Sequence, residues 1–142
     1  MSIILCPYVG FRGNAREAIT FYHSVFGGTL TISTFEDFHA SQDPLEMKLV
    51  MHSMLTTDNG LTIMASDRPL RMEHTPGDNY SITLSSPQAD EDQMRGYWNG
   101  LVVDGTITMP LAPSMWGDIF GMCIDKFGVS WIMNITVAPA EI

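Results

Sequence analysis

The spacing of apolar and polar residues along the chain repeats in the same order in each half. Apolar residues recur at helical spacing over 14–26 and 89–101, which predicts two amphipathic helices. Apolar runs rich in β-branched residues predict strands, and turn or linker residues such as glycine, proline and aspartate separate them. The expected strands cover 3–11, 29–35, 49–56, 61–66, 80–85, 105–109, 118–124 and 129–135. The polar segment 36–46 and the segment 110–117 are predicted to be loops.

Both halves therefore have the element order β-α-β-β-β, and their turns also correspond. The turn 58–60 and the strand after it match 125–128 and its strand, if one residue is inserted in the second turn. The turn glycines Gly60 and Gly128 are 128 − 60 = 68 residues apart, close to half of the chain. Because the order of elements and the turn chemistry repeat together, we interpret the chain as a duplicated unit.

The duplication predicts an α+β fold in a single domain. The first βαβββ module is expected at 1–66, a linker at 67–78 and the second module at 79–142. A chain of 142 residues that is 45% hydrophobic and 16% charged is long and apolar enough to bury a core.

The net charge of the chain limits the kinds of partner that it can be expected to bind. The chain has 7 Lys and Arg against 16 Asp and Glu, so its net charge is 7 − 16 = −9, which argues against nucleic-acid or anionic-membrane partners. No segment approaches the length of a membrane span, and the first residues lack the pattern of a signal peptide, so a cytoplasmic protein is expected. Cys6 and Cys123 lie in apolar strand-like segments, which favours two buried free thiols.

Several short motifs are distributed over nearly the whole chain, and the most specific of them lie in its last third. The motifs are Pro7-Tyr8-Val9-Gly10-Phe11, Phe21-Tyr22-x-x-Val25-Phe26-Gly27-Gly28, Met64-Ala65-Ser66-Asp67, Trp116-Gly117 and Phe120-Gly121-x-x-x-Asp125-Lys126-Phe127-Gly128-Val129-x-Trp131-x-x-Asn134. Together they resemble the PhnB-like branch of the vicinal-oxygen-chelate superfamily, which includes glyoxalases, bleomycin-resistance proteins and extradiol dioxygenases. The resemblance implies two βαβββ modules whose strands curl into a cup, with the helices packed outside.

The positions that carry metal ligands in metal-using relatives hold unsuitable residues here. In those relatives His, Gln or Glu side chains from the first and last strands of each module bind the metal. The resemblance places Pro7, Met64, Ser81 and Ile132 at these four positions. None of them is a plausible ligand for a hard or borderline divalent ion, so neither a metal nor a cofactor is expected.

Alternation along the strands predicts which residues face into the cup. Thr62, Met64 and Ser66 lie opposite the apolar set Leu61, Ile63 and Ala65. The same reasoning in the other strands predicts a polar, uncharged and hydroxyl-rich lining, while Trp131 falls in the core set. The predicted ligand-binding residues are Thr62, Met64, Ser66, Ser81, Thr83, Trp116, Phe120, Ser130 and Ile132.

His52 is the one candidate catalytic residue. It lies on an apolar strand and could act as a general base or hydrogen-bond a ligand near pH 7, or it could simply be satisfied by a neighbouring hydroxyl. Trp116 likewise has two interpretations, an aromatic lid over a bound molecule or a packing residue.

Three functions remain open. The leading hypothesis is a metal-free protein that binds a small molecule in the cup. The second is an enzyme of lyase, isomerase or dioxygenase type that uses His52, with or without a non-standard metal site, and the third is a dimeric structural or interaction protein. A homodimer is expected in each case, because relatives commonly pair their modules across subunits. The branch has also been labelled a ubiquinone-pathway methyltransferase, but the chain lacks the glycine-rich turn that usually holds a methyl donor.

Overall fold

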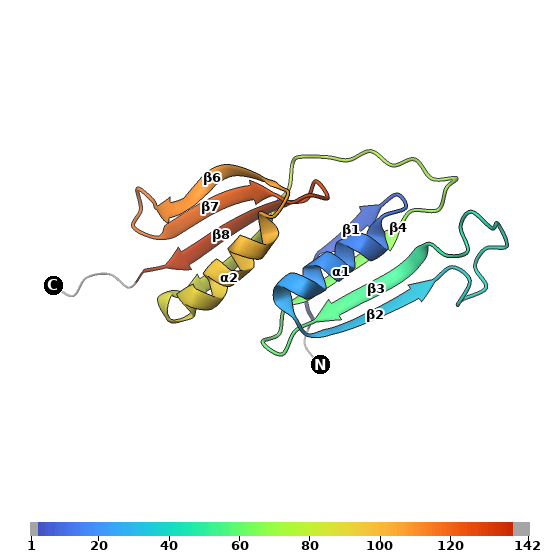
Figure 1. Cartoon of the computed structure of the whole chain (residues 1–142), viewed down its shortest axis with the longest axis horizontal. Helices are drawn as coiled ribbons and strands as arrows, with labels where there is room; N and C mark the ends of the chain where they lie inside the picture. Colours follow the sequence, from blue (N-terminus) through green and yellow to red (C-terminus); the bar gives the residue numbers. More distant parts are fainter. Residues whose placement is uncertain (1–2, 138–142) are drawn as a thin grey trace. The chain divides into compact units, whose positions relative to one another are not determined.

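The computed structural model describes residues 3–137 and divides the chain into two compact units, with the boundary between Pro76 and Gly77. Each unit has the order β-α-β-β-β and one four-stranded mixed sheet (Figure 1). The α+β fold with two βαβββ modules is thereby confirmed. Within the described residues, no helix has both the length and the apolar character needed to cross a membrane.

The first unit contains one helix and four strands. They are β1 (Tyr8–Phe11), α1 (Ala15–Phe26), β2 (Thr29–Thr34), β3 (Val50–Thr56) and β4 (Thr62–Asp67), and the strand order in the sheet is β1-β4-β3-β2. β1 pairs with β4 in parallel, and the other pairs are antiparallel.

The second unit repeats this topology with one additional short 3-10 helix. It consists of β5 (Ile82–Pro87), η1 (Gln88–Asp90), α2 (Glu91–Leu101), β6 (Thr106–Pro113), β7 (Ile119–Ile124) and β8 (Ser130–Thr136), in the sheet order β5-β8-β7-β6. β5 and β8 form the parallel pair.

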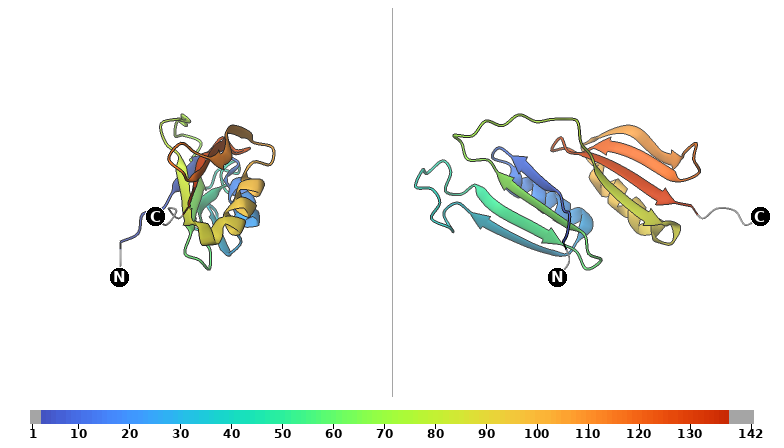
Figure 2. Two further views of the ribbon diagram at one scale, coloured as in Figure 1. Left: turned by 90° about the vertical axis from the view of Figure 1, so that its left-hand side faces the viewer. Right: turned by 180° about the vertical axis from the view of Figure 1, so that it is seen from behind.

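The helix of each unit covers one face of its sheet, and the hydrophobic core lies between them (Figures 1 and 2). The strands alternate accordingly: Ile63, Ala65 and Asp67 of β4 are buried, whereas the residues between them are half-buried. Trp131 is 3% exposed, which confirms its predicted place in the core. We call the face of each sheet away from its helix the open face.

The turn before the last strand is the same in both units, and the predicted one-residue insertion is wrong. The amides of Gly60 and Gly128 donate to the carbonyls of Thr57 and Asp125, each three residues earlier. Thr57 therefore corresponds to Asp125, and its hydroxyl accepts from the Leu61 amide as the Asp125 carboxylate accepts from the Val129 amide. The sequence pattern suggested Asp58 opposite Asp125 because the two residues match in chemical type, whereas the turn geometry pairs Asp125 with Thr57.

Two predicted strand boundaries are also wrong. The first strand begins at Tyr8 rather than at residue 3, and the side chains of Ile3 and Leu5 are fully exposed. The predicted loop 110–117 is instead partly strand, because β6 continues through Pro110 to Pro113. β6 lies at the edge of its sheet and its register shifts twice, and such positions tolerate proline because a ladder donor is not required there.

The two cysteines differ in environment. Cys123 is fully buried on β7, whereas Cys6 is half-buried before β1, so the prediction of two buried thiols is wrong for Cys6. Burial, with a smaller contribution from the charge of Asp125, raises the pKa of the Cys123 thiol to about 11. The nucleophilic thiolate form of Cys123 is therefore scarce at neutral pH.

We expect the native protein to react with one equivalent of a thiol reagent at pH 8, at Cys6, and the urea-unfolded protein with two. Titration with Ellman's reagent of the wild type and of a Cys6→Ser variant measures this, and rapid labelling of native Cys6→Ser would contradict it.

Because burial raises the folded-state pKa of Cys123, the contribution of this thiol to the stability of the fold is complete below its unfolded-state pKa. That contribution is lost as the pH rises towards about 11.

Candidate functional site

The open face of the first sheet carries polar side chains interleaved with methionines. The strand register places His52 beside Ser33, Met54 beside Met64 and Tyr8 beside Met64. Seven of the eleven residues on this face carry a hydroxyl, and two methionines lie beside one another among them. The open-face set is Tyr8, Gly10, Thr29, Thr31, Ser33, His52, Met54, Thr56, Thr62, Met64 and Ser66.

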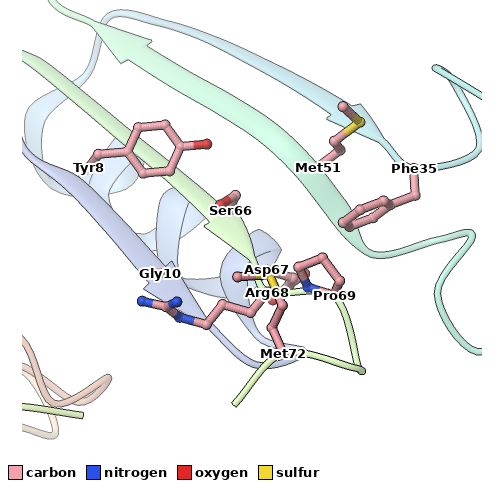
Figure 3. Close-up of a pocket in the computed structure, with 9 residues that line it drawn as sticks. All are labelled: Tyr8, Gly10, Phe35, Met51, Ser66, Asp67, Arg68, Pro69 and Met72. Carbon is pink, nitrogen blue, oxygen red and sulfur yellow. The ribbon is translucent and has the colours of Figure 1, made fainter. Parts of the chain in front are cut away.

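A cavity of about 350 Å³ lies at one end of this face. Its lining combines a phenol, a hydroxyl and a guanidinium with apolar side chains from two sides (Figure 3). The wall from the β2–β3 side comprises Phe35 and Met51, and the wall after β4 comprises Pro69 and Met72. The full lining is Tyr8, Gly10, Phe35, Met51, Ser66, Asp67, Arg68, Pro69 and Met72.

Arg68 lies over the backbone of Gly10 at this cavity. A Cβ atom on Gly10 would come within 3.2 Å of Arg68 Nε and 3.4 Å of Nη2. The position follows from the register: Gly10 pairs with Ser66, and the Arg68 amide continues the β1–β4 pairing by donating to the Phe11 carbonyl at 2.8 Å. Glycine at position 10 therefore gives the guanidinium room to lie against the sheet.

The segment after Arg68 is held in place from two directions. The Arg12 guanidinium donates to the carbonyls of Leu70 and Met72, at 3.4 and 3.3 Å. The Glu46 carboxylate accepts from the Leu70 amide at 2.6 Å and from the Ser41 hydroxyl at 2.9 Å. These bonds tie the apolar wall of the cavity to the β1–α1 turn and to the loop between β2 and β3.

Tyr8 connects the cavity to His52. The Tyr8 hydroxyl lies 3.5 Å from His52 Nδ1, and the two ring centroids are 5.9 Å apart. His52 is half-buried on the open face, in the region where the sequence predicts it. The distance places the pair at the limit of a hydrogen bond, and the role of His52 stays a prediction.

Asp67 has a structural role, although its backbone borders the cavity. Its side chain points to the helix side, where Oδ1 accepts from the amides of Gly13 (2.7 Å) and Ala15 (3.0 Å), and Oδ2 accepts from the amide of Val50 (3.0 Å). An internal carboxylate thus occupies the positive N-terminus of α1, which is the position where a bound phosphate or other anion would otherwise be favoured. Asp125 is buried in a related way, with Oδ2 accepting from Trp131 Nε1 at 2.9 Å.

Six of the predicted site residues belong to the second unit. Ser81 and Ser130 share a hydrogen bond of 2.7 Å on the open face of that sheet. Phe120 pairs with Asn134 in register, and its ring meets the exposed Trp116 edge-on with centroids 5.1 Å apart. The Trp116 ring therefore packs against Phe120 on one side, and the rest of the side chain is exposed to solvent. The six are Ser81, Thr83, Trp116, Phe120, Ser130 and Ile132.

The first unit holds the other four predicted residues, His52, Thr62, Met64 and Ser66. Of these, Ser66 lines the cavity. Sequence reasoning missed Tyr8, Gly10 and Arg68. The period of two did carry a signal for them: Tyr8 and Gly10 alternate with buried Val9 and Phe11, and Arg68 continues the series Thr62, Met64, Ser66 once β4 is extended.

The acidic and metal-binding side chains do not assemble into an ion site within residues 3–137. No group of three or more His, Cys, Asp or Glu side chains in this range has the geometry to hold a metal ion. The buried carboxylates of Glu46, Asp67 and Asp125 are each engaged by amide, hydroxyl or indole donors.

Comparison with known proteins gives the family. The family model described as 3-demethylubiquinone-9 3-methyltransferase matches residues 4–134. The structure of protein PA1353 from Pseudomonas aeruginosa is similar, with 33% identity, a TM-score of 0.79, and coverage of 96% of this chain and 100% of that one. A Bacillus cereus structure described as a putative 3-demethylubiquinone-9 3-methyltransferase, PhnB protein, is 26% identical with a TM-score of 0.69, covering 93% and 98% of the two chains.

More distant structures define the wider class. A glyoxalase/bleomycin resistance protein/dioxygenase family enzyme from Burkholderia phytofirmans shares the fold, with a TM-score of 0.57 at 12% identity over 90% of this chain and 94% of that one. The protein thus has the fold of the vicinal-oxygen-chelate superfamily. Within it, the chain belongs to the PhnB-like family whose model is described as 3-demethylubiquinone-9 3-methyltransferase.

Proposed function

We propose that the protein binds a small organic molecule in the cavity on the open face of the first unit. The observation that carries the proposal is the cavity itself. Its volume of about 350 Å³ falls at the lower end of the range of roughly 300–1,000 Å³ that is usual for ligand pockets. Its lining combines apolar side chains with a few polar groups, as ligand pockets do.

The side chains indicate how a ligand would be held. Met51 and Met72 are flexible and polarisable, so they adapt to an apolar ligand body. The Tyr8 and Ser66 hydroxyls offer both donors and acceptors at the floor. His52 is proposed to act through its contact with Tyr8, as an acceptor or donor that orients the phenol towards the ligand.

The methyltransferase description of the family is not carried into this proposal. Gly10 lies in β1 and Gly13 in the turn that follows it, but the Asp67 carboxylate already accepts from the amides of Gly13 and Ala15 at the start of α1. A nucleotide-like methyl donor would meet the charge of this carboxylate there.

A blocking substitution tests the binding proposal. We expect at least one compound from a panel of small aromatic acids, amides and amines to raise the midpoint of thermal unfolding of the wild type. At a ligand concentration one hundred times Kd the stabilisation is about 2.7 kcal/mol. Ser66→Trp fills the cavity and should abolish the shift, measured by differential scanning fluorimetry.

Thr20→Trp is the matched control, because it adds the same side chain at an exposed position of α1, on the other side of the sheet. It should retain the full ligand-induced shift. Equal shifts in wild type and Ser66→Trp would contradict the proposed site, and no shift with any compound would contradict binding.

We further propose that the protein acts as a cytoplasmic homodimer. Its two free cysteines support a reducing compartment, and the fully exposed apolar side chains of Ile3 and Leu5 support self-association. Sedimentation equilibrium at micromolar concentration should give twice the chain mass of 15.8 kDa. A monomer at all concentrations would contradict the dimer without affecting the proposed cavity.

A further inference from the structure

We infer that the ligand of the cavity carries one carboxylate on an apolar body, and that Arg68 binds this carboxylate. The inference rests on the proposed binding function and adds the chemical class of the ligand. The chain has a net charge of −9, yet the charged group with room to reach into the cavity is the positively charged guanidinium of Arg68.

Arg68 has unused hydrogen-bonding capacity in the described part of the chain. Its side chain is exposed and forms no ion pair with any carboxylate of residues 3–137, where the salt bridge found is between Arg95 and Glu91. The neighbouring acid, Asp67, directs its carboxylate to the opposite side of the sheet. The open-face set contains no Asp or Glu, so an anion beside Arg68 meets no like charge on this face.

The position of the guanidinium matches a bound carboxylate. It lies flat over Gly10 on the same side of the sheet as Ser66, with the Tyr8 ring above it in the view of Figure 3. A planar guanidinium presents paired N–H donors to both oxygens of a carboxylate. The Ser66 side chain lies on the same face, and the Tyr8 hydroxyl points away from Arg68, towards β3 (Figure 3).

The opposite side of the cavity determines the rest of the ligand. Phe35 and Met51 present apolar surface on the side away from the guanidinium, and Pro69 and Met72 lie beside the base of the Arg68 side chain, as Figure 3 shows. A molecule that fills both ends therefore has a single charged head and an apolar or aromatic body. The volume of about 350 Å³ limits this body to about the size of one or two rings.

Groups that would favour a doubly charged phosphate are engaged elsewhere. The Arg12 guanidinium donates to the Leu70 and Met72 carbonyls, and the amides of Gly13 and Ala15 at the start of α1 donate to Asp67. One guanidinium at the cavity of a chain with net charge −9 suits a single negative charge better than two.

Calorimetric titration of the full chain with four probes of similar shape tests the inference: benzoate, benzamide, benzylamine and phenyl phosphate. We expect benzoate to bind at least tenfold more tightly than benzamide or benzylamine, and more tightly than phenyl phosphate. The Arg68→Gln variant should lose about tenfold in benzoate affinity, the usual scale for one charge-assisted bond. Benzamide affinity should change less than twofold.

Arg71→Gln is the matched control, because it removes the same charge from an exposed arginine outside the cavity lining. It should leave benzoate affinity within twofold of the wild type, and Arg68→Lys should recover only part of the loss. Thermal unfolding midpoints of all variants establish that each is folded.

The outcomes separate this inference from the binding proposal. If benzamide binds as tightly as benzoate and Ser66→Trp abolishes both, the cavity binds ligands but the carboxylate assignment is wrong. A preference for phenyl phosphate would overturn the singly charged ligand, and an unchanged benzoate affinity in Arg68→Gln would overturn the role of Arg68. Failure of all four probes to bind the wild type would count against both.

Discussion

Replacing Asp67 with asparagine should lower the free energy of unfolding of the first unit by about 3 kcal/mol. The carboxylate accepts three backbone N–H bonds in a buried position, and an amide has one acceptor oxygen and places an NH₂ group against the remaining donor. The substitution also removes the negative charge from the N-terminus of α1. Urea unfolding followed by far-UV circular dichroism measures the loss.

Fluorescence is not a suitable probe for this variant, because Trp98, Trp116 and Trp131 all lie in the second unit. Amide hydrogen exchange of Ala15 and Val50 provides a local readout and should accelerate. Asp58→Asn removes the same charge from an exposed turn residue and should change stability by less than about 0.5 kcal/mol. Equal effects of the two substitutions would contradict the capping role of Asp67.

Replacing Gly28 with alanine should be at least as damaging, with an expected loss of about 4 kcal/mol. Gly28 has φ +93°, and a Cβ atom there would overlap the Thr56 carbonyl oxygen and approach Thr57 Cα to 2.8 Å. The left-handed conformation costs an alanine roughly 1–2 kcal/mol, and the collision with backbone adds roughly 1–3 kcal/mol. Urea unfolding by circular dichroism measures the sum.

Gly60→Ala isolates the conformational cost. Gly60 has nearly the same φ, +90°, but no atom lies within 4 Å of the position of an added Cβ. It should therefore lose only about 1 kcal/mol. If Gly28→Ala were no worse than Gly60→Ala, the close approach of the helix end to the β3–β4 turn would not be a constraint on the fold.

The second unit repeats the constraint at Gly28. An added Cβ on Gly105 would lie 2.5 Å from the Ile124 carbonyl oxygen and 3.2 Å from Asp125 Cα. The residue before β2 and the residue before β6 thus meet equivalent backbone, Thr56–Thr57 and Ile124–Asp125. This supports the duplication more directly than sequence matching, because the steric requirement itself is repeated.

The sequence predicted the faces of the strands well, because burial there depends only on local alternation. Thr62, Met64 and Ser66 lie on the open face and Ile63 and Ala65 on the core face, as expected. The predicted strand 105–109 ends too early, because proline usually indicates the end of a strand, whereas the irregular edge strand β6 accommodates it.

The buried acids could not be predicted in the same way. Asp67 and Glu46 were assigned to a polar linker and a polar loop, since acidic residues there are usually solvated. Their partners are backbone amides contributed from 17 to 54 positions away along the chain, at Val50, Leu70, Ala15 and Gly13. Only the folded topology brings these donors together.

In the candidate site, too, the sequence predicts the residues whose position depends on local alternation and misses those whose position depends on strand pairing. Ser66 was predicted because its own strand alternates, but Arg68 lay in a segment predicted to be a linker. Its place over Gly10 depends on the parallel pairing of β1 with β4, which joins residues about 56 positions apart, such as Gly10 and Ser66. The absence of a side chain at Gly10 is informative only once that pairing is known.

The central claim is that a small molecule binds on the open face of the first unit, and titration of the ¹⁵N-labelled protein with benzoate, benzamide, benzylamine and phenyl phosphate in turn tests it most directly. We predict saturable shifts in the backbone amides of Tyr8, Gly10, Ser66, Arg68 and Met72, and a loss of these shifts in Ser66→Trp. Saturable shifts confined to the second unit, or none at any amide that borders the cavity, would contradict the account.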